Sequence, residues 1–96
     1  MPKAYLVAHI RVHDREAFEE FRKLSGTAIA DHGGRVLVRN PEADHREGGL
    51  RGTVMVIEFD DMEAARRFYE SDAYSAARRV RERAAETDLL LVEGVA

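Results

Sequence analysis

Hydrophobic and polar positions alternate strictly near the start of the chain. From Ala4 to Val12 every second residue is apolar, whereas the intervening positions are mixed. A period of two predicts a β-strand with one dry face and one more polar face. The third expected strand is apolar at both parities apart from Glu58, which is typical of a central strand covered on both faces. The strands expected after the first one are residues 35–39, 53–59 and 89–92.

The segment after the first strand shows helical spacing instead. From Asp14 to about Asp31, apolar residues recur at steps of three and four and predict an amphipathic helix. Asp14 is the expected N-cap, and Gly33-Gly34 supplies the left-handed conformation that ends such a helix. One face of this helix is therefore expected to cover the sheet. Its apolar stripe comprises Ala17, Phe18, Phe21, Leu24 and Ala28.

A second helical pattern starts directly after the third strand. Asp60, with Glu63 three residues later, resembles a capping box, and apolar residues follow at helical spacing. Ser71-Asp72 interrupts this pattern and is expected to cap a second helical segment from residue 73 to about residue 85. The chain then returns to strand character at residue 89.

The order of elements is β-α-β-β-α-β over residues 1–96, which we interpret as a single domain. Right-handed crossovers predict a ferredoxin-like α+β sandwich, in which a four-stranded antiparallel sheet in the order 4-1-3-2 carries two helices on one face. On the second strand, Val36 and Val38 are expected to share one face. Residues 40–52 are polar and rich in glycine, and they predict a long hairpin loop of a length that is often functional or mobile.

The central strands carry more apolar residues than one layer of helices can cover. A monomer would expose a large apolar patch, and such a patch usually marks the surface for a partner. Two sheets packed face to face would form a dimeric α/β barrel. We therefore expect a homodimer with C2 symmetry, formed through the open face of the sheet.

The composition excludes several classes of function. Of the 96 residues, 15 are basic and 18 acidic, and a formal net charge of −3 gives no global reason to bind nucleic acid. The absence of cysteine excludes disulfides, thiolate nucleophiles and cysteine-based metal sites. No apolar run approaches the ~18 residues of a membrane helix, and the first residues lack the apolar core of a signal peptide. We expect a cytoplasmic protein that binds neither nucleic acid nor a membrane.

Two ionisable residues on the central strands are candidates for catalysis. Glu58 occupies a position where the strand pattern favours an apolar residue, so its carboxylate should be paired or carry a raised pKa. Its functional interpretation is a general base or ligand contact. His9 lies on the mixed face of the first strand and suits acid–base chemistry near neutral pH, although a hydrogen-bonded core or interface histidine is more common. For Glu58 the favoured alternatives are exposure at the strand end or a structural ion pair with an arginine such as Arg11, Arg35 or Arg39.

Tyr69 and Tyr74 flank the helix break at Ser71, and Glu58 is expected to face the same break. The tyrosine hydroxyls are candidates for a cleft between helix and sheet, although packing with each hydroxyl at the surface is favoured. Four arginines cluster later in this helical region and could bind an anion. The preferred interpretation is that they lie near a helix C-terminus and pair with Glu82 or Glu86. These arginines are Arg78, Arg79, Arg81 and Arg83.

Neither a metal nor a cofactor is expected. His9 and His13 share a parity but would lie ~13 Å apart along an extended strand. His32 and His45 fall at a helix end and in a loop, and no pair of histidines is spaced for a metal on a predicted helix. The glycine pairs have no phosphate-loop spacing, and the three serines have no signature of a nucleophile triad.

Six short motifs are spread along nearly the whole chain. They are residues 12–16 (VHDRE), 33–39 (GGRVLVR), 47–48 (EG), 56–65 (VIEFDDMEAA), 68–74 (FYESDAY) and 92–94 (VEG). Each motif alone is weak, but taken together they are specific and resemble those of one family of small bacterial proteins, domain of unknown function family 1330. Asp60 and Arg15 replace family prolines, Gly49-Leu50 stands where the family often has tryptophan, and Thr53 stands where it often has arginine.

This resemblance implies a ferredoxin-like fold and a dimeric α/β barrel, and no established activity. It suggests a homodimer that binds a small organic molecule in a pocket between the sheet and the helices. The wider superfamily supplies the alternative of a cofactor-independent enzyme resembling a monooxygenase or isomerase, and a non-catalytic structural dimer is a further alternative. The ligand-binding candidates carried over by matching motif are Arg39, Glu58, Tyr69, Ser71 and Tyr74.

Overall fold

The computed structural model describes residues 2–96, in which helices and strands follow one another in the order β-α-β-β-α-α-β. The strands are β1 (Ala4–Val12), β2 (Arg35–Asn40), β3 (Thr53–Phe59) and β4 (Ala85–Glu93). The helices are α1 (Arg15–Asp31), α2 (Met62–Glu70) and α3 (Asp72–Ala84).

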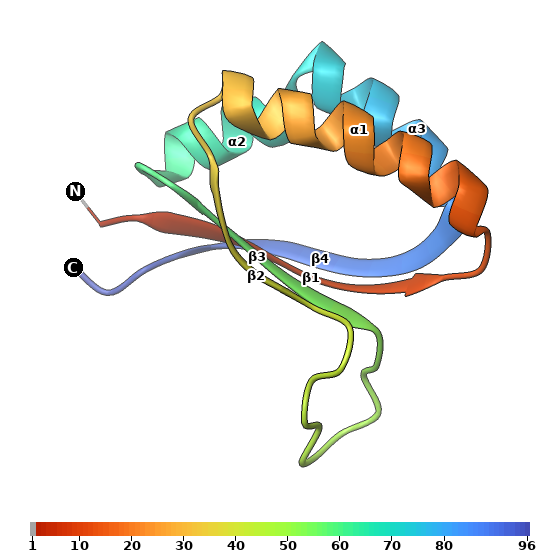
Figure 1. The fold of residues 1–96 in the computed structure, drawn as a ribbon. Helices are drawn as coiled ribbons and strands as arrows, with labels where there is room; N and C mark the ends of the chain where they lie inside the picture. The colour runs from red at the N-terminus through yellow and green to blue at the C-terminus, as the bar shows by residue number, and fades with distance from the viewer. Residues whose placement is uncertain (1) are drawn as a thin grey trace.

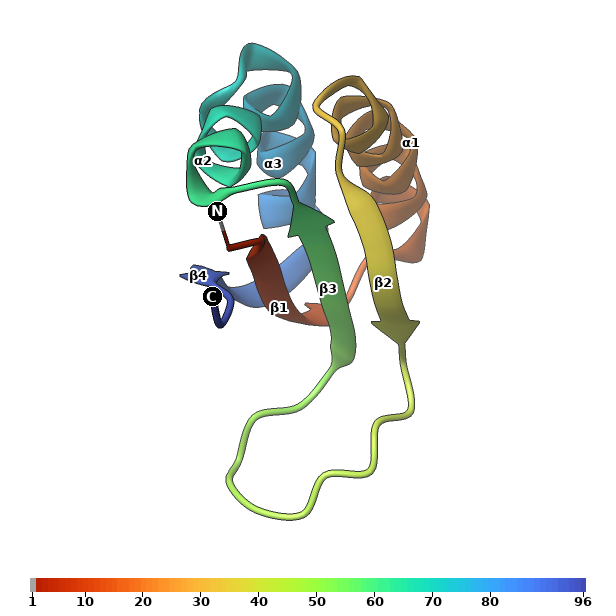
Figure 2. The ribbon, with the colours of Figure 1, turned by 90° about the vertical axis from the view of Figure 1, so that its left-hand side faces the viewer.

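The strands form one antiparallel sheet in the order β2-β3-β1-β4, which confirms the predicted order 4-1-3-2. All three helices lie on the same face of this sheet, and α1 and α3 run side by side across it (Figure 1). The view along the layers shows that no helix or strand of residues 2–96 covers the opposite face of the sheet (Figure 2). The ferredoxin-like α+β fold predicted from the element order is therefore confirmed.

The predicted interruption of the second helix is a true break between α2 and α3, made by one hydroxyl group. Ser71 Oγ donates to Phe68 O at 2.7 Å and accepts from Tyr74 N at 3.1 Å. The same side chain thus satisfies a carbonyl at the end of α2 and an orphan amide at the start of α3. The helical layer consequently contains three helices instead of the two that were predicted.

The helix caps follow the sequence prediction at α1 and depart from it at α2. Asp14 Oδ1 accepts from Ala17 N at 3.1 Å, as expected of an N-cap. The α2 cap is Asp61, whose Oδ1 accepts from Ala64 N at 2.8 Å, so the capping box predicted at Asp60 is wrong. The chain uses both aspartates to turn from β3 into the helical layer, because β3 continues to Phe59 and α2 begins only at Met62.

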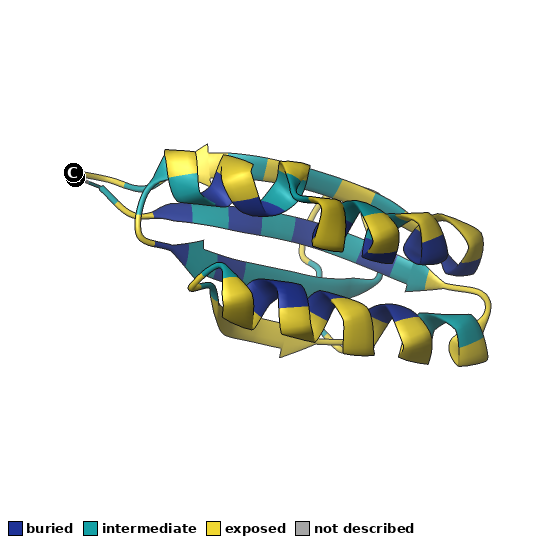
Figure 3. Ribbon diagram, turned by 90° about the horizontal axis from the view of Figure 1, so that it is seen from above, coloured by how far each residue is buried: buried dark blue, intermediate teal, exposed yellow. Residues whose placement is uncertain are grey.

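The core lies between the helices and the covered face of the sheet, where buried residues line the inner side of each helix (Figure 3). In α1 the buried stripe is Phe21, Ser25, Ala28 and Ile29, whereas Leu24 remains 40% exposed. The predicted stripe was therefore shifted around the helix. Leu24 lies at the edge of the true stripe, and the polar Ser25 concealed its centre from a pattern based on hydrophobicity.

Strand β4 is longer than the predicted residues 89–92, because it begins immediately where α3 ends. It pairs with β1 along its whole length, from Ala4 opposite Glu93 to Val12 opposite Ala85. The first residues of β4 are polar and lack the apolar pattern of a strand, so the sequence did not predict them as part of it. Arg11 holds them in the sheet through ion pairs to Asp88 at 2.7 Å and Glu86 at 4.0 Å.

The second strand contains a bulge that changes which residues face the helices. Val36 pairs with Ile57 and Val38 with Val56, and the register shifts between them. Ile57 is a core residue, whereas Val56 lies on the open face, so Val36 and Val38 do not share a face as predicted. Beyond the bulge, Arg39 pairs with Met55 and lies on the helix-covered side. A bulge re-aims the side chains that follow it, and here it places the exposed Arg39 on the helix-covered side of the sheet.

Within residues 2–96, no helix is long and apolar enough to cross a membrane.

Candidate functional site

A cavity of about 230 Å³ lies between α1 and the sheet, close to the end of β2. Its apolar walls come from β1, β3 and the inner side of α1, with Pro41 at the edge where β2 enters the long loop. Four polar residues share this lining, and two of them are arginines. The apolar residues are Ile10, Phe18, Phe21, Ile29, Pro41 and Met55, and the polar ones are Arg22, Ser25, Arg39 and Thr53.

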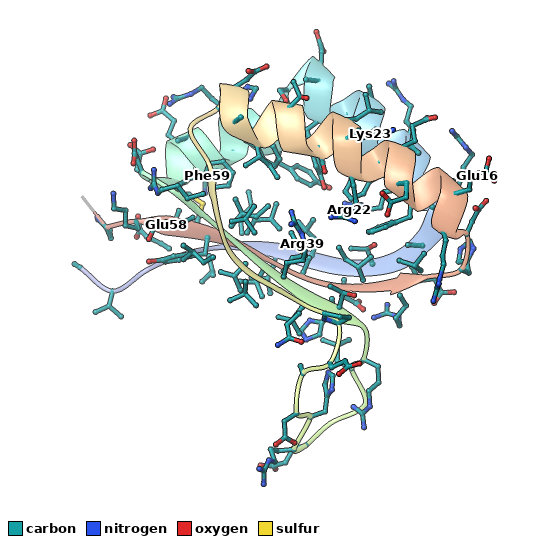
Figure 4. The ribbon with its side chains drawn as sticks, in the orientation of Figure 1. Glu16, Arg22, Lys23, Arg39, Glu58 and Phe59 are labelled. Carbon is teal, nitrogen blue, oxygen red and sulfur yellow. The ribbon has the colours of Figure 1, made fainter. Side chains whose placement is uncertain are left out.

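The two arginines reach the cavity from opposite walls. Arg22 extends from α1 and Arg39 from β2, and both side chains lie in the space between this helix and the sheet (Figure 4). Arg22 pairs with Glu19 one turn earlier at 3.1 Å. The ion pairs formed within residues 2–96 do not include Arg39.

A smaller cavity of about 30 Å³ adjoins the first and extends the site toward α3. The two cavities have five residues of their walls in common, and the smaller one adds Tyr74, Arg81 and Leu89. Arg81 is only 7% exposed, and its Nη1 donates to the Tyr74 hydroxyl at 2.7 Å. Burial raises the pKa of Tyr74 above its ordinary value of 10.0, so this hydroxyl stays protonated at neutral pH.

Arg81 is a buried cation that forms no ion pair with a carboxylate of residues 2–96. Its guanidinium carbon lies 6.0 Å from the centre of the Phe21 ring, and its Nε has no hydrogen-bond partner among the described residues. Burying a cation normally requires an opposite charge or a full set of hydrogen bonds. A negative charge in the neighbouring cavity would therefore stabilise the buried guanidinium of Arg81.

Glu58 lies on the open face of the sheet and does not line either cavity. Its Oε1 accepts from Arg35 Nε at 2.9 Å, and its Oε2 accepts from the Tyr5 hydroxyl at 3.3 Å. The hydrogen bond from Arg35 holds the pKa of the Glu58 carboxyl below its ordinary value of 4.5. This contact matches one of the predicted alternatives, the ion pair with Arg35. The prediction that Glu58 faces the break at Ser71 is wrong, because that break belongs to the layer on the other side of the sheet.

Replacing Glu58 by glutamine is expected to lower the free energy of unfolding at neutral pH. Because the folded-state pKa is lowered, the ion pair stabilises the fold fully above the ordinary pKa of 4.5 and loses this effect as pH falls through the lowered value. The difference between wild type and Glu58→Gln should therefore be largest near pH 7 and shrink as the pH falls below the ordinary pKa of 4.5. Urea midpoints across this range measure it, with Glu47→Gln in the exposed loop as the control. A difference independent of pH would contradict the assignment.

His9 also lies on the open face, opposite Val54 on β3 and Asp88 on β4. The centre of its ring is 6.4 Å from that of His45, which belongs to the long loop. His9 therefore lies outside the cavity, beside the loop. Across residues 2–96, no group of three or more histidine, aspartate or glutamate side chains is arranged to hold a metal ion.

The residues around the helix break divide into two groups. Tyr74 reaches the smaller cavity, whereas Tyr69 packs against the Tyr74 ring at 5.5 Å between centres and accepts a hydrogen bond from Arg78 at 3.2 Å. Ser71 is occupied by the two helix ends that it caps. Of the five predicted ligand contacts, the structure thus places only Arg39 and Tyr74 at the adjoining cavities.

Four polar residues at the cavities are not among the predicted ligand contacts, namely Arg22, Ser25, Thr53 and Arg81. Of these, only Arg81 was considered in the sequence, as one of four arginines that could bind an anion. Arg81 was expected to pair with Glu82 or Glu86, which is wrong, since Glu86 pairs with Arg11 and Arg81 is buried. The helical spacing of α3 could have predicted that Arg81 is buried. Arg81 follows Tyr74 and Ala77 by seven and four residues and precedes Ala84 by three, so it lies on the buried stripe of α3.

Comparison with known protein families gives a match over almost the entire chain. Residues 3–95 match the sequence profile of the family described as domain of unknown function (DUF1330). The chain belongs to the DUF1330 family. None of the curated proteins matches this DUF1330 protein.

Solved structures that are similar to this DUF1330 protein share its fold at low sequence identity. A protein of unknown function from Rhodopseudomonas palustris has 16% identity and a TM-score of 0.77, covering 99% of this chain and 84% of that one. SnoaB, a cofactor-independent oxygenase from Streptomyces nogalater, has 13% identity and a TM-score of 0.70, covering 100% and 96%. A dimeric protein of unknown function with a ferredoxin-like fold from Bacteroides fragilis has 11% identity and a TM-score of 0.64, covering 96% of both chains. These similarities establish the shared fold.

Proposed function

We propose that this DUF1330 protein binds a small organic molecule in the cavity between α1 and the sheet. The observation that carries the proposal is an apolar cavity into which a few polar side chains converge, which is the usual composition of a small-molecule site. The volume of about 230 Å³ corresponds to roughly eight water-sized groups at ~30 Å³ each. A molecule of about ten non-hydrogen atoms is the expected size of the ligand.

The residues around the cavity favour binding over acid–base catalysis. Neither lining contains a histidine, aspartate or glutamate, and the ionisable groups present are arginines and the protonated Tyr74. A general base would need a pKa near the working pH, which an arginine does not have. The alternative of a cofactor-independent enzyme is supported by the shared fold with SnoaB, and a shared fold does not by itself assign an activity.

We further propose that the protein is a homodimer in which two open sheet faces pack together. Val7 on β1 pairs with Val56 on β3 and Leu90 on β4, so these three residues form an apolar centre on the open face. Leu90 is 54% exposed in the single chain. Charged clusters flank this centre, with Glu58 and Arg35 at one end and Arg11 and Asp88 at the other. An apolar centre with a polar rim is the anatomy of a protein interface.

Filling the cavity tests the binding proposal. Ser25 lines both cavities from α1, and the substitution Ser25→Leu places an apolar side chain inside them. The matched control is Thr27→Leu on the exposed side of the same helix, because both hydroxyls hydrogen-bond to carbonyls of their own helix. A thermal-shift screen of small organic molecules should give ligands that stabilise the wild type and the Thr27→Leu variant. Those ligands should lose their effect on Ser25→Leu.

Two results would overturn this proposal. The first is a screen in which no small molecule, whether anionic, neutral or cationic, raises the melting temperature of the wild type. The second is a set of ligands that stabilise Ser25→Leu as much as the wild type, since such ligands would bind elsewhere on the protein. Comparing the unfolding of each variant without ligand shows whether it is folded.

A further inference from the structure

We infer that the ligand is an organic carboxylate, with its carboxylate group held between Arg22 and Arg39 and its apolar body inside the cavity. The inference rests on the proposed binding function and names the chemical class of the ligand. It starts from the two guanidinium groups that approach the same space from α1 and β2 (Figure 4). A guanidinium group presents paired N–H donors that match the two oxygens of a carboxylate.

The charged residues that line the two cavities are all positive. Arg22 and Arg39 line the larger cavity and Arg81 lines the smaller one, while neither lining includes an acidic residue. The whole chain carries a formal net charge of −3, so this positive region contrasts with the protein as a whole. A local cluster of positive charge against apolar walls favours an anion, because low-dielectric walls weaken screening of the field inside.

Within residues 2–96, Arg39 has the orientation and the free donors expected of a residue that binds an anion. The bulge in β2 turns it toward the helices, where the sequence alternation alone would have placed a valine. No ion pair among the described residues engages its guanidinium. Arg22 has only the partly exposed Glu19 as a partner, so it is also able to donate to a ligand.

The buried Arg81 adds a second, independent reason for an anion. Among the residues that the structure describes, its Nε is buried without a hydrogen-bond partner, and its Nη1 donates to the neutral hydroxyl of Tyr74. An unpaired buried cation destabilises the folded protein. An anion in the adjoining cavity would offset part of this cost through the electrostatic field, without a direct contact to Arg81. The ligand and the fold would therefore stabilise each other.

The apolar walls limit the rest of the ligand. Phe18 and Phe21 form a tilted aromatic pair with ring centres 5.3 Å apart, and Ile10, Ile29 and Met55 complete the surface. A single aromatic ring or a short alkyl chain fits a space of roughly eight water-sized groups. Benzoate, with nine non-hydrogen atoms, is therefore a suitable probe of the proposed class.

The test compares three probes that share one ring and differ in charge, namely benzoate, benzamide and benzylamine. Titration at constant ionic strength, followed by calorimetry or by changes in amide NMR signals, should rank benzoate above benzamide and benzamide above benzylamine. Arg39→Met keeps an unbranched apolar side chain and removes the charged guanidinium group. This variant is expected to weaken benzoate binding by about tenfold or more, because a charge-assisted hydrogen bond is lost. Benzamide binding should change little.

Two controls separate this site from general attraction of anions. Arg66→Met removes an exposed arginine on α2 and should leave benzoate binding as in the wild type. Inorganic sulfate should bind more weakly than benzoate, because it gains nothing from the apolar walls.

The outcomes distinguish the inference from the proposed function. Equal binding of benzoate and benzamide, or unchanged benzoate binding in Arg39→Met, would overturn the carboxylate inference. The binding function would survive that result if Ser25→Leu still abolished binding. If none of the probes bound and the broader screen also failed, both the inference and the proposed function would fall.

Discussion

The Phe68→Ala variant is expected to lose about 3–5 kcal/mol of stability, which is the usual cost of removing a large buried aromatic side chain. Phe68 is completely buried, and its ring lies between those of Phe59 and Tyr74 at centre-to-centre distances of 5.1 and 4.6 Å. It therefore joins the end of β3 to both sides of the helix break. Truncation leaves a cavity where the sheet, α2 and α3 meet, and rigid neighbours allow little collapse into it.

A loss of this size is large for a chain of 96 residues, since domains unfold with only about 5–15 kcal/mol. It should lower the melting temperature by roughly 15 °C or more. Calorimetry at one fixed protein concentration measures the change, because the melting temperature of the proposed dimer would depend on concentration. Tyr69→Ala is the control, since Tyr69 is only partly buried and should cost less. Equal losses in the two variants would show that Phe68 has no special position in the core.

The Val7→Glu variant is expected to convert the proposed dimer into a folded monomer. Val7 occupies the centre of the open face, with Val56 and Leu90 as its cross-strand partners. In an interface with C2 symmetry the substitution enters twice, so two carboxylates would be buried without partners close to the axis. Each buried unpaired charge costs several kcal/mol, which exceeds what a modest interface can offset.

Sedimentation velocity at micromolar concentration measures this change, and circular dichroism checks that the fold is retained. Val95→Glu makes the same chemical change at a side chain that is fully exposed and should leave the assembly as in the wild type. A wild-type protein that already sediments as a monomer would contradict the dimer proposal. The same conclusion would follow if Val7→Glu stayed dimeric.

The fold could be predicted from the sequence because residues with strong local conformational preferences define most of its helices and strands. The alternation from Ala4 to Val12 and the Asp14 cap both define elements without help from distant residues. The break at Ser71 is equally local, since one hydroxyl serves two helix ends. The start of β4 could not be predicted from local preferences, because its polar residues are held in the sheet by ion pairs to Arg11 on another strand.

The site was predicted only in part because its residues are brought together by long-range geometry. Arg39 enters the cavity only because of the bulge in β2, and nothing in the alternation of that strand reveals a bulge. Ser25 was not predicted, and Arg81 was interpreted as a cation paired near the helix C-terminus, because a polar residue on a buried stripe interrupts the hydrophobic pattern. Glu58 was a candidate because it is an acid within an apolar strand. Its position next to the core residue Ile57 places it on the face opposite the cavity.

The direct passage from α3 into β4 ties the two ends of the proposed site to the fold in different ways. Ala84 O, at the end of α3, accepts hydrogen bonds from both His13 N at 2.9 Å and Asp14 N at 3.1 Å. This single carbonyl fastens the start of α1 to the end of α3, one turn beyond Arg81. At the other end, Arg39 and Pro41 lead into the long loop that projects away from the sheet and helices (Figure 2). One end of the proposed site is thus tied to the chain by main-chain hydrogen bonds beside Arg81, whereas its other end, at Arg39, lies where the sheet gives way to the loop.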